Sequence, residues 1–317
     1  MNMEKMNQIL LQVKKVIIGK DEILKKVLLS IMARGHILIE DIPGVGKTTL
    51  ALAFSKAMDL QCKRLQFTPD VLPSDITGFS IFDKNVNDFV YKPGVAMCNL
   101  FLADEINRTS SKTQSALLEI MEEGNITVDG ITRQLPEPYI VIATQNPIGS
   151  IGTHMLPESQ LDRFMIRITM GYPDIKSEIE ILKSKQGKLP LNEIEKVVDC
   201  KEIVEIQNSV EKVYINDISY EYIARLVLAT RENPLIQLGV SPRGTLALVK
   251  MSKANAYFNG RMYVIPEDVM EVFKDVVQHR IILNQRLQNN DITVEKVIDN
   301  IMTTVKLPKI IGEKRWY

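Results

Sequence analysis

The stretch HILIEDIPGVGKTTLALAFSKAM, residues 36–58, constrains the fold of this chain more than any other part of the sequence. Its first five residues form an apolar run with the length and branching of a buried strand, and residues 47–58 carry apolar side chains at helical spacing. A strand, a glycine-containing turn and a helix start are the context that a phosphate-binding loop requires. The sequence therefore predicts a loop whose backbone N–H groups, helped by the positive end of the helix dipole, hold a polyphosphate.

Two side chains of this loop have expected roles in the chemistry. Lys47 is expected to reach the β- and γ-phosphates, and Thr48 is expected to hold Mg²⁺ through its hydroxyl. The strict pattern GxxxxGK[ST] fails at its first position, which is Asp41. Gly44 and Gly46 still let the backbone approach the phosphates closely, so the prediction of a phosphate-binding loop is kept. The alternative is an ordinary strand–turn–helix connection with a chance GKT.

The composition limits the classes of protein to consider. At 317 residues, with 45% hydrophobic and 25% charged residues, the chain has the size for two domains and the balance of an ordinary globular protein. Lys+Arg and Asp+Glu both number 39, so there is no global basic field for nucleic acid. The three cysteines match neither a metal site nor a disulfide framework, which favours a reducing compartment. No apolar run approaches the roughly 18 residues of a membrane span, and no signal-peptide pattern is present, so we expect a cytoplasmic protein.

Hydrophobic periodicity divides the chain into two parts. The first part predicts helices over 3–15, after Asp21 (as the cap) and over 113–123, and strands over 36–40, 62–67, 100–103, 139–144 and 165–169. It also predicts hairpins over 80–91 and 125–135, the second with a tight turn at Asp129–Gly130. After residue 174 helical patterns dominate, at 175–186, 199–211, 217–232, 242–258, 266–277 and 293–304. We therefore expect an α/β domain over residues 1–174 and a smaller all-helical domain over 175–317.

Polar side chains end two of the predicted strands. Asp104 and Glu105 follow the strand over 100–103, and Asn146 follows the strand over 139–144. The carboxyl ends of parallel strands line the ligand crevice of such a sheet, so these groups should face the phosphate loop. Asp104 suits Mg²⁺ coordination, Glu105 suits a general base for water, and Asn146 could orient that water. A solvated strand end and a turn-forming asparagine before proline are the structural alternatives.

Five ordered motifs, GVGKTT, LADEINR, ATQNP, PESQLDRF and VSPRGTLAL, resemble those of AAA+ ATPases, specifically the MoxR family. The resemblance covers about Ile18 to Ile281. It implies an AAA+ module, a parallel-sheet P-loop NTPase domain with a smaller all-helical lid domain. It also implies that ATP and Mg²⁺ are bound by the phosphate-loop residues together with Asp104, namely Gly44, Val45, Gly46, Lys47, Thr48 and Thr49.

Further roles follow only from the resemblance. Arg163 matches the arginine finger that reaches the γ-phosphate bound by a neighbouring subunit, with Arg108 as the rival candidate. Arg243 matches the sensor 2 arginine of the lid, which contacts the nucleotide. Ile17 and Ile18, with the glycine after them, match the segment that packs on adenine. The alternatives are a surface ion pair, a solvent-facing arginine and ordinary core packing.

The resemblance also gives a meaning to the two hairpins and singles out one loop. In related rings the hairpins face the central pore, so Phe82 and Phe89 are candidate contacts for a client protein, with cross-strand packing as the alternative. The segment 148–156 departs from the family pattern, which puts any family role of that loop in doubt. His36, His154 and His279 form no ligand spacing, and we interpret them as structural.

The resulting hypothesis is an ATP hydrolase that assembles with copies of itself into a ring, expected to be a hexamer. It would use Mg-ATP at subunit interfaces to remodel or mature a client protein, as a chaperone does. The resemblance adds a von Willebrand A-domain partner on another chain as a candidate. The alternatives are a nucleic-acid motor, disfavoured by the zero net charge, a nucleotide-gated scaffold that does not hydrolyse ATP, and the ATPase subunit of a magnesium-chelatase-like complex.

Overall fold

The predicted buried strands form one five-stranded parallel sheet in the structure, a computed structural model that describes residues 2–146, 156–184, 190–284 and 292–308. Every neighbouring pair is parallel, and the strand order is β2-β5-β8-β1-β9. The strands are β1 (Ile37–Glu40), β2 (Cys62–Gln66), β5 (Leu100–Asp104), β8 (Ile140–Gln145) and β9 (Ile166–Ile168). All five strands expected from the sequence are confirmed, with ends that differ by at most one residue.

The middle of this sheet is buried on both faces. Every residue of β5 and of β8 is buried, which explains why these segments read as continuous apolar runs rather than as alternating patterns. Leu38, Phe101, Val141 and Phe164 belong to one core cluster that joins the sheet to the helices beside it. Strand β1 pairs with β8 on one side and β9 on the other, so the loop after it leaves from inside the sheet.

Helices surround the sheet in the first part of the chain. They are α1 (Asn2–Lys14), α2 (Asp21–Met32), α3 (Lys47–Ala57), α5 (Ser111–Glu123), α7 (Ile175–Ser184) and α8 (Cys200–Glu211), with the short pieces α4 (Pro73–Thr77), η1 (Ile106–Arg108), α6 (Glu158–Leu161) and η2 (Pro190–Glu193). The prediction that Asp21 caps its helix is wrong. Lys20 occupies the N-cap position without a side-chain cap, and Asp21 is the first helical residue, where its charge suits the helix dipole.

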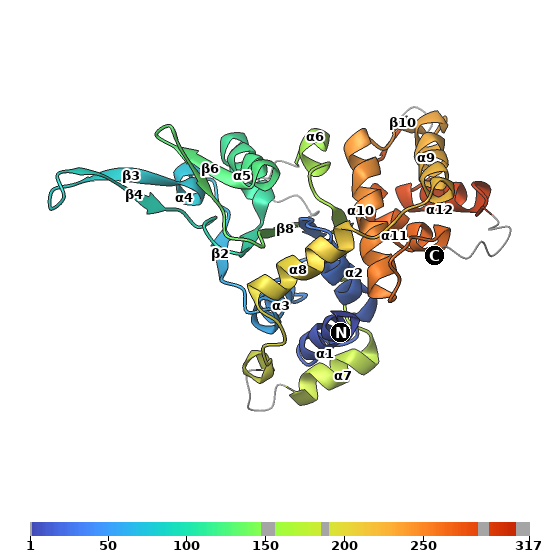
Figure 1. Ribbon diagram of the computed structural model, residues 1–317, viewed down its shortest axis with the longest axis horizontal. Coiled ribbons are helices and arrows are strands. Elements are labelled where there is room, and N and C mark those ends of the chain that lie inside the picture. The colour runs from blue at the N-terminus through green and yellow to red at the C-terminus, as the bar shows by residue number, and fades with distance from the viewer. Residues whose placement is uncertain (1, 147–155, 185–189, 285–291, 309–317) are drawn as a thin grey trace. The chain divides into compact units, whose positions relative to one another are not determined.

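Both predicted hairpins are confirmed. The first is β3 (Gly78–Asp83) with β4 (Asp88–Pro93), which Figure 1 shows as a long two-stranded ribbon extending past α4. The second is β6 (Asn125–Val128) with β7 (Ile131–Gln134). Its turn residues, Asp129 and Gly130, have φ of 52° and 74°, the positive values that a type I′ turn needs at both positions.

Helices dominate the C-terminal part of the chain, as predicted. They are α9 (Asp217–Glu232), α10 (Pro242–Phe258), α11 (Pro266–Val277) and α12 (Val294–Thr304). The fully buried Leu226, Leu248, Phe273 and Ile298 come one from each of these helices. Two strands that the sequence did not reveal, β10 (Ile236–Leu238) and β11 (Ile282–Leu283), pair antiparallel beside them. They have only three and two residues, too few for an alternating pattern to be recognised.

The chain divides into two compact units, Met1–Ser209 and Val210–Tyr317. The boundary expected near residue 174 lies inside the first unit, and as a boundary between functional domains it stays a prediction. In the described parts of the chain, no helix has both the length and the apolar character needed to span a membrane.

Candidate functional site

The loop between β1 and α3 has the backbone conformation that its glycines allow. Gly44 has φ of 88°, and Gly46 has φ of 94° and occupies the N-cap position of α3 in the left-handed region. A side chain at either position would strain this backbone, so the glycines are needed for the turn itself. Lys47, the first residue of α3, is buried, and its Nζ donates to the backbone oxygen of Asp41 at 2.7 Å.

The electrostatics of Lys47 connect this loop to the acids on β5. Burial lowers the pKa of the Lys47 ammonium, and the negative charges of Asp41, Asp104 and Glu105 only partly oppose that shift. The carboxylates of Asp104, at the end of β5, and of Glu105, directly after it, therefore lie within electrostatic reach of the loop lysine. An ammonium that is short of solvation gains most from an added polyanion, which is the kind of ligand that the loop backbone suits.

Asp104 ends β5 and is held from two sides. The Thr144 hydroxyl on the neighbouring strand β8 donates to its Oδ1 at 2.6 Å, and the Arg64 guanidinium on β2 donates to its Oδ2 at 2.6 Å. Both partners come from strands that pair directly with β5. Neither Arg64 nor Thr144 was predicted as part of the site, since nothing in their local sequence marks them.

Glu105 follows in an unusual backbone conformation. Its φ of 56° lies in the left-handed region, which is uncommon for a residue with a side chain and recurs at functional sites. Its backbone N–H donates to the Thr144 hydroxyl at 2.9 Å, and its carboxylate accepts from Arg108 Nη1 at 2.7 Å. Arg108, the rival finger candidate, is thus paired with the acid of its own chain.

Asn146 follows β8, next to the end of β5. Its backbone oxygen accepts a hydrogen bond from Asn107 Nδ2 at 3.4 Å. Asp104, Glu105 and Asn146 therefore lie at the carboxyl ends of two adjacent parallel strands, and β1 with the phosphate loop comes next in the sheet. The three residues that the sequence analysis expects at the carboxyl edge of the sheet therefore lie at that edge in the structure.

A pocket of about 510 Å³ adjoins the phosphate loop. Six of the predicted ligand-binding residues line it, namely Ile17, Ile18, Gly44, Val45, Gly46 and Thr49. Among the described residues, the rest of the lining consists of the segment Met170–Pro173 with Val16, Lys20, Pro43, Glu178, Ile181 and Leu191. Sequence reasoning missed this segment. The turn signal Gly171–Tyr172–Pro173 directly after a strand could have indicated it, because loops at carboxyl ends of strands form ligand sites.

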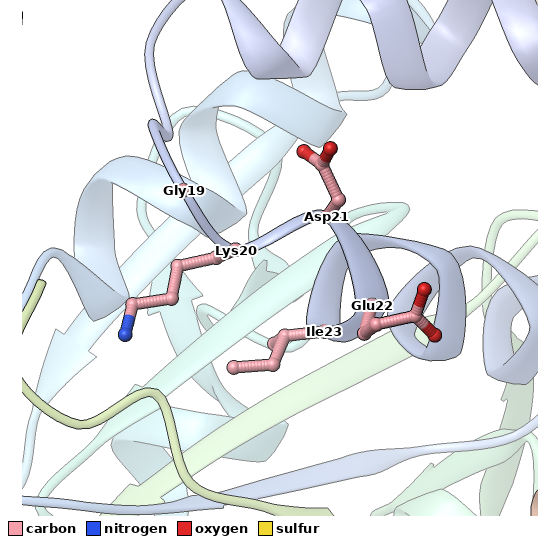
Figure 2. Close-up of a pocket in the computed structure, with 5 residues that line it drawn as sticks. All are labelled: Gly19, Lys20, Asp21, Glu22 and Ile23. Atoms are coloured by element: carbon pink, nitrogen blue, oxygen red, sulfur yellow. The ribbon is translucent and has the colours of Figure 1, made fainter. Parts of the chain in front are cut away.

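A second hollow, of about 430 Å³, lies over the start of α2 and is lined by residues 19–23 (Figure 2). Figure 2 shows the side chains of Lys20 and Ile23 extending to one side of the helix start, whereas those of Asp21 and Glu22 point elsewhere. Lys20 also lines the larger pocket, where its Nζ donates to the backbone oxygen of Tyr172 at 2.9 Å. The hollow therefore adjoins the larger pocket, and Lys20 lines both.

The two arginines expected from the resemblance lie on different units. Arg163 follows α6, and its Nε donates to Glu122 Oε2 on α5 at 2.9 Å. Arg243 is an exposed residue in the first turn of α10 in the second unit. These placements leave the proposed roles of both residues as predictions. Most of the 148–156 loop, including His154, lies outside the described residues.

His36 has the structural role that the sequence indicated. Its Nδ1 accepts from the backbone N–H of Val141 at 3.1 Å, which leaves Nε2 to donate to the backbone oxygen of Met121 at 3.0 Å. The ring therefore joins the start of β1 to β8 and α5.

The donors at this site suit a magnesium nucleotide. Thr48 and Asp104 offer hydroxyl and carboxylate oxygens, and Mg²⁺ is held in proteins by one or two such ligands together with substrate phosphates. Within the described residues no group of three or more His, Cys, Asp or Glu side chains could hold a metal ion alone. Such a metal would depend on the phosphates for its remaining ligands, and the positive-φ glycines leave the loop backbone open to them.

The parallel sheet, the glycine loop ahead of α3 and the acids after β5 define a P-loop ATPase of the AAA class. A sequence model described as the ATPase family associated with various cellular activities (AAA) matches residues 36–166, and one described as an AAA lid domain matches residues 228–301. Both matches agree with an α/β nucleotide-binding domain followed by a helical lid.

Three relatives define the family more closely. The chain is 45% identical over 296 residues to the uncharacterized protein YeaC of Bacillus subtilis, covering 93% of this chain and 92% of that protein. It is 36% identical over 308 residues to the protein named Chaperone MoxR1 of Mycobacterium tuberculosis, covering 94% and 81%. A solved protein from Cytophaga hutchinsonii matches with a TM-score of 0.89 and 39% identity, covering 97% and 96%. The chain belongs to the MoxR family of AAA+ ATPases and is an ATP hydrolase by that membership.

Proposed function

We propose that this chain binds Mg-ATP in the pocket beside the phosphate loop. The backbone of residues 44–49 holds the phosphates, with Lys47 on the β- and γ-phosphates. Thr48 and Asp104 hold Mg²⁺, and Ile17 and Ile18 pack against the adenine. The lining of one pocket by these isoleucines and by the loop glycines supports this arrangement.

For hydrolysis we assign the acids and amide at the strand ends. Glu105 takes the proton from the attacking water, and Asn146 orients that water. Bound Mg²⁺ supplies charge neutralisation at the phosphates. To act as the base, the Glu105 carboxylate has to turn from Arg108, its partner at 2.7 Å, toward the water.

One observation carries this assignment: β1 pairs with β8 and β8 pairs with β5, so the loop that holds Lys47 and the acids Asp104 and Glu105 leave the same carboxyl edge of the sheet. A lysine from the loop after β1 and two acids from the end of β5 are far apart in sequence. Their meeting at this edge supports one catalytic centre there, and the negative charges of both acids partly oppose the burial that lowers the pKa of Lys47.

The site would be completed by a neighbouring copy of the chain. We assign Arg163 as the finger that reaches the nucleotide of the next subunit, in a ring that we expect to be a hexamer. Arg243 would contact the nucleotide from the lid and couple its state to the lid. We assign the nucleotide-binding core to residues 1–174 and the lid to 175–317, and the lid match over 228–301 supports the second assignment.

The work done with ATP would be the remodelling or maturation of a client protein, in the cytoplasm. The relative named Chaperone MoxR1 supports a chaperone-like role. Phe82 and Phe89 on the β3–β4 hairpin are exposed and packed against one another with ring centroids 5.6 Å apart, so they are both a cross-strand pair and candidate client contacts. A von Willebrand A-domain protein on another chain is a candidate partner.

Two substitutions test the proposed chemistry. Lys47→Ala should weaken ATP binding roughly 10- to 100-fold, the size of one lost charged interaction in a dry site. Glu105→Gln should retain ATP while turnover falls about 10²- to 10⁴-fold, the usual contribution of a general base. Binding is measured by titration calorimetry and turnover by phosphate release. Unchanged ATP affinity in the first variant would overturn the loop assignment, and preserved turnover in the second would remove Glu105 from the mechanism.

A further inference from the structure

Asp41 stands where the strict phosphate-loop pattern has glycine, and its side chain is engaged in the interior. The residue is only 4% exposed. Its Oδ2 accepts from the backbone N–H groups of Met170 at 2.6 Å and Gly171 at 2.7 Å, and its Oδ1 accepts from Ile42 N–H at 2.8 Å. Three backbone donors thus converge on one carboxylate.

The main chain of Asp41 is engaged as well. Its N–H donates to the backbone oxygen of Gln145 on β8 at 3.1 Å, and its own oxygen accepts from Lys47 Nζ at 2.7 Å. One residue therefore connects β8, the start of the phosphate loop, the loop lysine and the segment after β9.

A negative charge at this position needs a physical reason. The carboxylate repels the phosphates that the loop is expected to hold, and glycine would satisfy the loop conformation without that repulsion. Glycine, however, has no side chain that could accept hydrogen bonds from the N–H groups of Met170 and Gly171. These residues belong to the 170–173 segment, which lines the pocket together with Ile17 and the loop glycines.

The segment after β9 has little else in the sheet to position it. Strand β9 has three residues and lies at the edge of the sheet, so its pairing with β1 ends at Ile168. Met170 and Gly171 come directly after that point, and the Asp41 carboxylate receives their N–H groups. Charge-assisted bonds of this length are among the strong ones in proteins.

We propose that Asp41 is a positioning residue that holds the 170–173 segment in register with the phosphate loop. Recognition of the nucleoside part of ATP is thereby coupled to recognition of its phosphates. The inference rests on the proposed function, because it requires that ATP occupies this pocket. It adds a residue that the strict phosphate-loop pattern does not contain.

The test compares a whole nucleotide with its phosphate part alone. Calorimetry on the full chain gives the dissociation constants of Mg-ATP and of magnesium tripolyphosphate for the wild type, Asp41→Gly and Asp41→Asn. Asp41→Gly should weaken ATP about tenfold, as expected for lost charge-assisted hydrogen bonds, while tripolyphosphate binds as well as before or better. Asp41→Asn keeps one acceptor oxygen. Its loss of affinity for ATP relative to tripolyphosphate should therefore be smaller than that of Asp41→Gly, but in the same direction.

The control is Asp59→Asn, which removes an exposed carboxylate that pairs with Lys196 and lines neither the pocket nor the second hollow. It should leave both constants unchanged. Equal changes for ATP and tripolyphosphate in the Asp41 variants, or no change for either, would overturn the inference. If Asp41→Gly fails to fold by circular dichroism, the selectivity of Asp41→Asn decides. A wild type that binds neither ligand would instead contradict the proposed function.

Discussion

Thr144 is a buried hydroxyl that serves two neighbouring acids at once. It donates to Asp104 Oδ1 at 2.6 Å and accepts from the backbone N–H of Glu105 at 2.9 Å. A hydroxyl is one of the few side-chain groups that can donate and accept at the same position. It therefore orients the carboxylate of Asp104. Through its bond to the backbone N–H, it also stabilises the left-handed conformation of Glu105.

Thr144→Val is the sharpest test of this arrangement, because valine has almost the same shape and no hydrogen bonds. We expect the free energy of unfolding to fall by about 1–3 kcal/mol, since a buried N–H and a carboxylate oxygen each lose their partner. Turnover should fall more than ATP affinity, because the acids are misplaced while the loop is intact. Urea denaturation and steady-state ATPase kinetics measure the two effects.

Thr144→Ser is the matched control, since it keeps the hydroxyl and removes only a methyl group. Its turnover should stay near that of the wild type. Equal losses of turnover in the valine and serine variants would show that packing at this position, rather than the hydrogen bonds, supports the site.

At the scale of elements, two side-chain contacts connect the two hairpins with the short helix α4. The Arg133 guanidinium on β7 lies 3.9 Å from the centre of the Tyr91 ring on β4, and the Tyr91 hydroxyl donates to the backbone oxygen of Thr77 in α4 at 2.5 Å. A guanidinium over an aromatic face contributes about 0.5–1 kcal/mol at an exposed site. The hairpins are therefore expected to move together rather than independently.

Arg133→Ala should loosen this connection. We expect faster hydrogen exchange of the backbone amides of β3 and β4, by about two- to fivefold, with little change in the exchange of the buried strands β5 and β8. Exchange measured by mass spectrometry resolves the two regions. Arg133→Lys keeps a cation and should show a smaller effect. Unchanged exchange in the alanine variant would mean that the Tyr91–Thr77 bond alone holds the hairpin.

The same elements show what the sequence could and could not predict. Strands β5 and β8 and the loop between β1 and α3 are specified by local residues, so their positions and the ends carrying Asp104, Glu105 and Asn146 were predicted. The sequence predicts no helix at the position of α4. This helix has five residues with Pro73 at its start, which is too short for a helical period to show.

The hydrogen-bond partners of the predicted site residues could not be predicted from the sequence, for a related reason. Arg64 and Thr144 meet Asp104 only because β2 and β8 pair with β5, and Met170 meets Asp41 only because β9 pairs with β1. Short-range patterns carry no information on such contacts. Asp41 was discounted as a departure from the loop pattern, whereas its side chain turns out to have the most backbone contacts of the loop residues described above.

At the scale of the whole molecule, the proposed assembly makes the chemistry depend on concentration. Specific ATPase activity should rise with protein concentration, in parallel with assembly followed by sizing, if Arg163 of one copy completes the site of the next. Arg163→Ala should lower turnover by about 10³- to 10⁵-fold and leave ATP binding largely intact. Mixing it with Lys47→Ala should restore part of the activity, since each variant supplies what the other lacks.

Glu122→Gln is the matched control for this experiment. It removes the charge of the acid that Arg163 contacts within its own chain, at 2.9 Å, and should not reduce turnover. Flat specific activity from a monomer, or no rescue in mixtures that co-assemble by sizing, would contradict action between subunits.

The two outer strands of the parallel sheet have a consequence for solubility. An open strand edge offers unpaired backbone groups to any other chain, and it is a common starting point for aggregation. Here β9 is only three residues long, and β2 carries Lys63 and Arg64 among its five residues. A short edge and a charged edge both disfavour edge-to-edge pairing. We therefore expect the parallel sheets of two copies of the chain not to pair edge to edge, even where the copies come close together in the proposed ring.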